Sequence, residues 1–156
     1  MVNQDKLSAN KIDAMRAFVY FSHLMDKAVI DNNGEVAGKL YDIIVKPSEV
    51  YPQSASLIIR KGFPNRKYAV INWSDILNWD DKEIALKIDK AKIVFREKHN
   101  NKEELTLRRD ILDQQVVDTY NHKVIRVNDI HLLRVDHCLM LAHVDISLRG
   151  LIRRLG

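Results

Sequence analysis

The sequence predicts an all-β fold in which one small β unit occurs twice. The first copy is DKAVIDNNGEVAGKLYDIIV at residues 26–45, and a diverged copy, DQQVVDTYNHKVIRVNDIHL, occupies residues 113–132. A constant offset of 87 residues relates the two segments without a gap, as it relates Phe18 to Leu105. Identities, the position of a turn and the alternation of apolar residues all agree at this offset, which is the pattern of an internal repeat.

Composition limits the class of protein. With 156 residues, of which 46% are hydrophobic, the chain can bury the core of one domain or of two very small ones. The formal net charge of +4 is modest and neither half forms a basic arm, so nucleic acid is not an expected partner. The sole cysteine, Cys138, lies in an apolar run and is expected to be buried filler. No secretory signal or membrane span is visible, which predicts a cytoplasmic location.

The first half is expected to span residues 17–97, after a polar tail over residues 1–16. Ser22 and Ser74 each have the chemistry to cap one short helical turn. Between the polar turns, β-forming residues predict strands. These strands cover residues 17–21, 29–30, 36–45, 56–60, 67–73 and 83–88, with a further short strand at 93–95.

A tight turn joins the two strands of each copy. In the first copy it contains Asp31 and Gly34, because glycine tolerates the positive φ of a hairpin turn and aspartate bonds nearby backbone N–H groups. Asp118 is the equivalent aspartate of the second copy. We interpret these aspartates as turn residues, in preference to the oxygen ligands of a magnesium site.

The strand after the turn changes its alternation phase. Gly38 and Leu40 share one face of the strand, whereas Ile43 continues the apolar set in the opposite phase. A slip near Asp42 reconciles the two phases and predicts a β-bulge. The second copy repeats the slip at Asp129, so both aspartates are interpreted as bulge residues.

The second half is expected to span residues 103–156, after a polar turn at residues 98–102 that marks the repeat boundary. It opens with a strand over residues 105–107 and, after the second copy, continues with a strand over residues 139–146. Apolar residues at helical spacing then predict a helix over residues 147–155. This half lacks counterparts of the last strands of the first half, so its barrel is incomplete. We expect either a chain cut from a longer protein, which we favour, or completion by strands of the first copy or of a partner.

The order of these elements, AVIDNNGEVAGKLYDIIV followed by SLIIR and AVINWSDI, resembles the PRC-barrel, a small β-barrel domain. With VIRVNDIHLL and the closing VDISLRGLIRRLG, the chain is similar to the cytoplasmic N-terminal region of MgtE-like magnesium transporters. The resemblance implies a tandem PRC-type barrel that serves as an adaptor or regulatory module, with an MgtE N-terminal helical domain and CBS domains as partners. The second copy departs from the first where Asn121 and Ile125 replace Gly34 and Gly38.

No motif of catalysis or cofactor binding accompanies these elements. The six histidines are scattered, and the sequence contains no HExxH, GxSxG, GxGxxG, P-loop or EF-hand spacing. His131 and His143 fall in predicted strands and are expected to be packed or hydrogen-bonded. Tyr68 and Trp73 are expected in the core, in preference to stacking on bases. We therefore expect that the chain is no enzyme and needs no cofactor or metal.

The candidate interaction surface lies at the end of the chain. Arg149, Arg153 and Arg154 belong to the predicted terminal helix, where they suit an acidic partner domain, a phosphate or a lipid headgroup, or form a solvated face. Exposed strand edges and the loop at residues 51–54 are further candidates. We expect a non-catalytic adaptor that contacts other domains or subunits of a magnesium-transport-associated protein. An RNA or ribosome-assembly adaptor like RimM is the alternative, and a homo-oligomer stays open.

Overall fold

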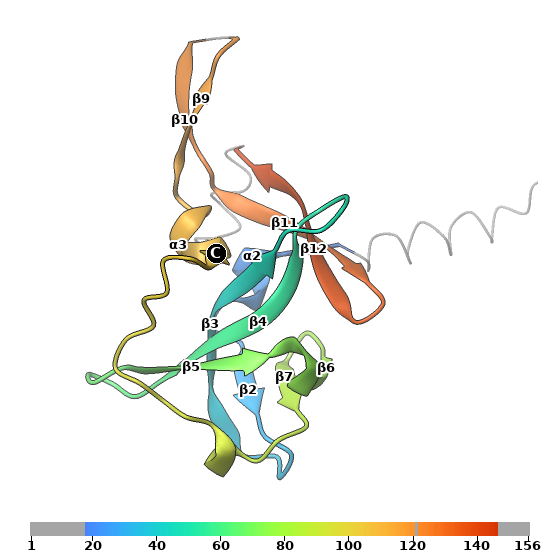
Figure 1. Ribbon diagram of the computed structural model, residues 1–156, viewed down its shortest axis with the longest axis vertical. Helices are drawn as coiled ribbons and strands as arrows, with labels where there is room; N and C mark the ends of the chain where they lie inside the picture. Colours follow the sequence, from blue (N-terminus) through green and yellow to red (C-terminus); the bar gives the residue numbers. More distant parts are fainter. Residues whose placement is uncertain (1–17, 121, 147–156) are drawn as a thin grey trace, which may run out of the picture.

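The computed structural model describes residues 18–120 and 122–146, and strands dominate it, as the predicted all-β class requires (Figure 1). The predicted tail 1–16, the predicted helix 147–155 and the three arginines Arg149, Arg153 and Arg154 lie outside the described residues. In chain order the elements are β1 (Phe18–Tyr20), α2 (Phe21–Leu24), β2 (Ala28–Ile30), β3 (Val36–Lys46), β4 (Gln53–Lys61), β5 (Lys67–Asn72), η1 (Trp73–Asp75), β6 (Ile76–Trp79), β7 (Glu83–Leu86), η2 (Lys90–Lys92), β8 (Leu105–Thr106), α3 (Leu107–Asp110), β9 (Gln115–Asp118), β10 (Lys123–Arg126), β11 (Asp129–Val135) and β12 (Cys138–Asp145).

Most of these strands belong to a single curled sheet (Figure 1). Its strand order is β1-β11-β12-β4-β3-β2-β7-β6, with β5 paired to β4 and β8 paired to β3. The neighbours are antiparallel except for β2 and β7, which are parallel. β9 and β10 form a separate two-stranded ribbon that projects from the rest of the molecule. In the part of the chain that the structure describes, no helix is long and apolar enough to cross a membrane.

The two halves of the chain exchange their first strands. β1 of the first half pairs with β11 of the second half, where Val19 lies opposite Leu132. β8 of the second half pairs with β3 of the first half, where Leu105 lies opposite Val45. Strands of one half therefore extend the sheet of the other, which is the less favoured of the two expectations from the sequence.

The offset of 87 residues recurs in the backbone contacts. The N–H of Asp26 donates to the carbonyl of Leu40 at 2.9 Å, and the N–H of Asp113 donates to the carbonyl of Val127 at 3.0 Å. Both aspartates have positive φ, 63° and 65° respectively. The same backbone contact thus precedes the first strand of the hairpin in each half, β2 and β9, whereas the assignment of either half to a PRC-barrel stays a prediction.

The core lies inside the curl of the sheet and is closed by the two short helices. Phe21 of α2 and Leu107 of α3 are fully buried, as are Leu40 of β3, Ile59 of β4 and Ile130 of β11. Removing each of these side chains from water contributes about 2 kcal/mol before the entropy of folding is considered. Because both halves supply members of this one cluster, neither half has a core of its own among the described residues.

The predicted bulge is confirmed in β3 but takes another form in the second half. In the ladder between β3 and β4 the register shifts between Leu40 and Asp42. At the equivalent place the second half breaks into β10 and β11. Its ladder shift between His131 and Leu132 is instead the counterpart, at the offset of 87, of a second shift in β3 between Ile44 and Val45. The difference arises because β10 leaves the sheet to pair with β9, whereas β3 stays in the sheet over its whole length.

Several local predictions were wrong. Ser22 does not cap a helix, because α2 begins one residue earlier and the Ser22 hydroxyl donates to Asp129 at 2.7 Å. The turn predicted from Ser74 is the 3-10 turn η1, which has no side-chain cap and leads directly into β6, a strand that the sequence did not indicate. Residues 93–95 form no strand. Cys138 begins β12 and is half-buried rather than fully buried.

The loop proposed for partner contacts at residues 51–54 is already engaged within the chain. Its second part belongs to β4, and the Ser54 hydroxyl accepts a hydrogen bond from the N–H of Leu139 at 3.0 Å. The Pro52 carbonyl accepts another from the N–H of Leu141 at 2.9 Å. These contacts join β4 to β12, so this segment connects the halves. Tyr51 at its start is 44% exposed, and contact of this residue with a partner stays a prediction.

Candidate functional site

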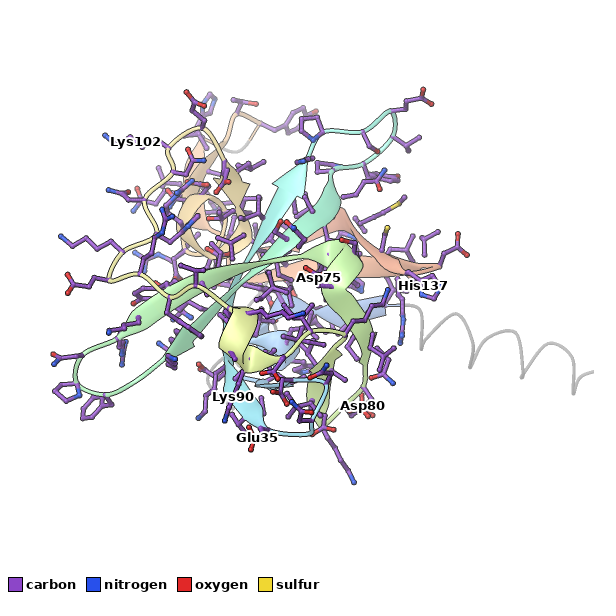
Figure 2. The ribbon with its side chains drawn as sticks, turned by 60° about the horizontal axis from the view of Figure 1, so that its bottom comes forward. Glu35, Asp75, Asp80, Lys90, Lys102 and His137 are labelled. Atoms are coloured by element: carbon purple, nitrogen blue, oxygen red, sulfur yellow. The ribbon has the colours of Figure 1, made fainter. Side chains whose placement is uncertain are left out.

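Two adjoining depressions form a groove beside β5. The smaller has a volume of about 230 Å³ and the larger of about 660 Å³. They share Tyr68, Lys98, His99 and Asn100, so we treat them together and call them the β5 groove. One wall comes from β5, and the other comes from the chain that leads from Lys90 toward Lys102 (Figure 2).

One edge of β5 is largely open. The strand is paired with β4 along its whole length, whereas on its other edge the described residues supply only one bridge, between Tyr68 and Arg96. The N–H of Tyr68 donates to Arg96 at 2.7 Å, and the Tyr68 carbonyl accepts from Arg96 at 2.8 Å. Hydrogen-bonding direction alternates along an antiparallel strand, so the N–H and carbonyl of Val70 and Asn72 point the same way as those of Tyr68.

No described residue pairs with the outward backbone groups of Val70. Val94 would lie opposite Val70 if the bridge at Arg96 continued as a ladder, but the chain diverges from β5 there. The Val70 side chain is 43% exposed and lines the groove. An unpaired strand edge of this kind is a template for another extended chain.

Asp42 lies at the inner end of the groove and is 2% exposed. Its carboxylate accepts hydrogen bonds from the N–H groups of Ile43 at 2.8 Å, Arg108 at 2.7 Å and Arg109 at 3.2 Å. Burial raises the pKa of the Asp42 carboxyl, against the opposing effect of the backbone N–H groups. The carboxylate thus joins β3 to the first turn of α3, a helix of the other half, and has little capacity left for a ligand.

Aromatic rings form the wall between the inner end and the open edge. Tyr41 and Tyr68 meet edge to face with ring centroids 5.0 Å apart. The Arg108 guanidinium lies 4.5 Å from the centroid of the Tyr41 ring, and that of Arg60 lies 5.4 Å from it. These cation–π contacts fix the ring of Tyr41 and leave Tyr68 as the aromatic surface along the groove.

The charges that line the groove are mostly positive. Arg96 and Lys98 are exposed, and in the described ranges neither side chain forms an ion pair or a hydrogen bond. Arg109 is held by Asp110, whose carboxylate raises the pKa of the guanidinium and whose own pKa is lowered by it. His99 contacts Glu104 at 2.9 Å. Free positive charge is therefore concentrated at Arg96 and Lys98, on the outer wall.

The aspartate predicted in the first hairpin turn is a turn residue that also reaches a distant segment. Asp31 accepts from the N–H groups of Asn33 at 2.9 Å and Glu35 at 2.8 Å. Its other oxygen accepts from the N–H of Lys90 at 3.1 Å, in the first residue of η2. Lys90 also pairs with Glu35 at 2.7 Å, and both residues lie at the same end of the molecule (Figure 2).

We expect the stabilising effect of Asp31 to disappear in acid. The backbone N–H of Lys90, then those of Glu35 and Asn33, holds the pKa of Asp31 below its ordinary value of 3.8. A lowered pKa in the folded state means that this stabilisation is complete above the unfolded-state value and is lost as pH falls below it. Asp31→Asn should therefore lower the urea midpoint at pH 7, and the difference from wild type should shrink below about pH 3.8.

The control for this measurement is Asp81→Asn at an exposed position of the loop between β6 and β7. It should leave the urea midpoint nearly unchanged at both pH values. A difference between wild type and Asp31→Asn that stays constant down to pH about 2 would contradict the role given to the Asp31 charge.

The other predicted residues are dispersed over the fold. Gly34 has a φ of +77° in the hairpin turn, and Gly38 lies in β3 close to the backbone of β4. Asp129 accepts from the N–H of Ile130 at 2.8 Å and from Ser22, 107 residues away. Asp118 is the last residue of β9, opposite Lys123. Of the predicted residues that lie within 18–120 and 122–146, only Asp42 lines the β5 groove.

Two histidines of the second half, His131 and His143, contact each other, as expected for residues that are packed or hydrogen-bonded in strands. His131 and His143 are directly opposed in β11 and β12, with Nδ1 of one 2.6 Å from Nε2 of the other. Tyr20 stacks on His131 with ring centroids 4.7 Å apart. Within residues 18–120 and 122–146, no group of three or more histidine, cysteine, aspartate or glutamate side chains is placed to hold a metal ion.

Sequence reasoning did not find the residues that form the outer wall of the groove. Lys98 and His99 belong to a polar stretch that was interpreted only as the boundary between repeats. The alternation of Val94, Arg96 and Lys98 on one side of an extended chain was the available indication. Tyr68, expected in the core, instead lines the groove, whereas Trp73 packs against the core as expected.

Comparison with models of known protein families gives no match to this chain, and a search of curated proteins gives none either.

Proposed function

We propose that the chain is a non-catalytic docking module that takes up an extended segment of a partner along the open edge of β5. The observation that carries this proposal is the edge itself, where Val70 presents an unpaired backbone N–H and carbonyl beside a groove. Addition of a strand to a sheet edge obtains affinity from main-chain hydrogen bonds and specificity from the alternate side chains.

The resemblance of the sequence to MgtE-like proteins suggests the larger protein to which this module would belong. We propose that it belongs to a magnesium-transport-associated protein of the MgtE type, with the MgtE N-terminal helical domain or the CBS domains as the source of the docked segment. A purified MgtE-type N-terminal domain, added to the isotopically labelled chain, should perturb the amide resonances of Tyr68 and Val70. Perturbations elsewhere on the molecule and none along β5 would contradict docking at this edge.

The edge is tested by Val70→Pro. Proline removes the outward N–H and is tolerated at the edge of a sheet, and the ladder with β4 uses the neighbouring residues of β5. A library of displayed random peptides should yield sequences that bind the wild-type chain. Their affinity for Val70→Pro should fall about tenfold, since the central main-chain bond is lost.

The matched control is Val70→Thr, which keeps the N–H and the preference for extended backbone. It should bind the same peptides within about twofold of wild type. Circular dichroism and the urea midpoint of each variant show whether it is folded. Equal binding by Val70→Pro and wild type would overturn the proposed site, as would a library that yields no binding peptide.

The alternative, an RNA or ribosome-assembly adaptor, has one observation in its favour. The tip of the β4–β5 hairpin carries Phe63, which is 87% exposed, together with exposed Arg66 and Lys67. Exposed aromatic and basic side chains are the combination that single-stranded RNA requires. This function predicts binding to ribosomal RNA fragments that weakens steeply with salt and is lost in Phe63→Ala with Arg66→Ala.

A further inference from the structure

We infer that the β5 groove accepts an acidic extended peptide, whose glutamate or aspartate side chains face Arg96 and Lys98. This inference rests on the proposed docking at β5 and adds the chemistry of the partner. Three features of the groove support it: the position of its cations, the state of its carboxylates and the charge of the competing occupants.

The cations lie where a bound strand would place its side chains. Val94, Arg96 and Lys98 line the groove while Glu97, between them, does not. Arg96 is fixed beside β5 by its two backbone bonds to Tyr68. A peptide that pairs with Val70 therefore enters a groove lined by one guanidinium residue, Arg96, and one ammonium residue, Lys98. The described part of the chain leaves both without an anionic partner. Two residues of such a peptide, spaced i and i+2, would point toward this wall.

Three carboxylates near the groove are engaged elsewhere, and Glu97, which lies between the two cations in sequence, is not among the residues that line the groove. Asp42 is turned inward and bound to three backbone N–H groups. Asp110 is occupied by Arg109 at 2.8 Å, and Glu104 by His99 at 2.9 Å. The exposed end of the groove thus retains a local positive potential, which favours an incoming anionic chain.

The same charge disfavours the chain's own segments as occupants. Residues 147–156 contain Arg149, Arg153 and Arg154 and no acidic residue, so the groove would repel them. A second copy of this face would add its own exposed Arg96 and Lys98 to those of the first, which repulsion between like charges disfavours. Nucleic acid matches the charge but cannot continue the backbone ladder of a sheet edge, so an acidic peptide satisfies both requirements.

The test uses the whole chain and three synthetic peptides of about eight residues that alternate valine with glutamate, glutamine or lysine. Fluorescence anisotropy at low salt should rank them glutamate first and lysine last, with about tenfold between the glutamate and glutamine peptides. The preference should shrink in high salt. The double variant Arg96→Glu/Lys98→Glu should reverse the ranking, whereas the control Lys82→Glu should keep it.

The outcomes separate this inference from the proposed function. If all three peptides bind equally and lose binding in Val70→Pro, docking at β5 stands and the acidic partner is wrong. If the glutamate peptide binds but neither Val70→Pro nor the double variant changes its affinity, both are wrong. If an RNA oligonucleotide of equal charge binds in competition with the glutamate peptide and with higher affinity, the acidic peptide is overturned as the occupant.

Discussion

Replacing Asp42 by alanine should lower the free energy of unfolding by about 3 kcal/mol. The carboxylate is 2% exposed and accepts from the N–H groups of Ile43, Arg108 and Arg109. Alanine leaves all three donors without an acceptor in a site that water reaches poorly, and each buried unsatisfied N–H costs about 1 kcal/mol or more. Equilibrium urea unfolding followed by circular dichroism measures the change.

Three further variants test the cause of this loss of stability. Asp42→Asn keeps one acceptor oxygen and should lose less stability than Asp42→Ala, whereas the exposed control Asp81→Ala should change the free energy by less than about 0.5 kcal/mol. Asp129→Ala removes the equivalent contacts to Ile130 and Ser22 and should be similarly destabilising. A loss below about 1 kcal/mol for Asp42→Ala would show that the link from β3 to α3 is not a main support of the fold.

Gly38→Ala should lower the free energy of unfolding by about 2 kcal/mol, a large effect for one added methyl group. A Cβ at this position would lie 2.7 Å from the Arg60 carbonyl oxygen of β4, a contact that only backbone movement can relieve. Gly38 sits where β3 is bonded to β2 on one side and adjoins β4 on the other, so either movement strains a ladder. Urea unfolding again measures the loss.

Gly34→Asn is the matched control because it adds a larger side chain at a glycine with open space. No atom lies within 4 Å of a Cβ built on Gly34, and asparagine tolerates its φ of +77° better than other residues. This variant should lose less than about 1 kcal/mol. Equal losses for Gly38→Ala and Gly34→Asn would show that space beside β4 is not what requires glycine.

The close approach of β4 to Gly38 also explains why the second copy can have a different residue at the equivalent position. Ile125, the counterpart of Gly38, lies in β10, which is paired only with β9 among the described strands. No third strand presses on it there, so a large side chain fits. The sequence could show that the residues differ, but the reason is the ribbon's departure from the sheet, which no local pattern reveals.

Whether the other features could be predicted depends on how far apart in the sequence the interacting residues lie. The turn at Asp31 and the slip in β3 near Asp42 are encoded by neighbouring residues, and the sequence indicated both. The contacts of Asp42 with α3 and of Asp129 with α2 join residues 66 and 107 positions apart, and alternation within a strand contains no information about them. The β5 groove was missed for the same reason, because its walls are joined by contacts between residues distant in sequence, such as the bridge between Tyr68 and Arg96.

The exchange of first strands has a consequence for the order in which the chain is made. A ribosome releases β1 and Ser22 early, but their partners in β11 follow more than a hundred residues later, as the separation of 107 between Ser22 and Asp129 shows. Until then β1 of the nascent chain cannot pair with β11, and Ser22 of α2 lacks the Asp129 carboxylate that accepts its hydrogen bond. The pairing of β1 therefore forms late in synthesis, and a chain arrested before residue 129 lacks β11, the strand with which β1 pairs.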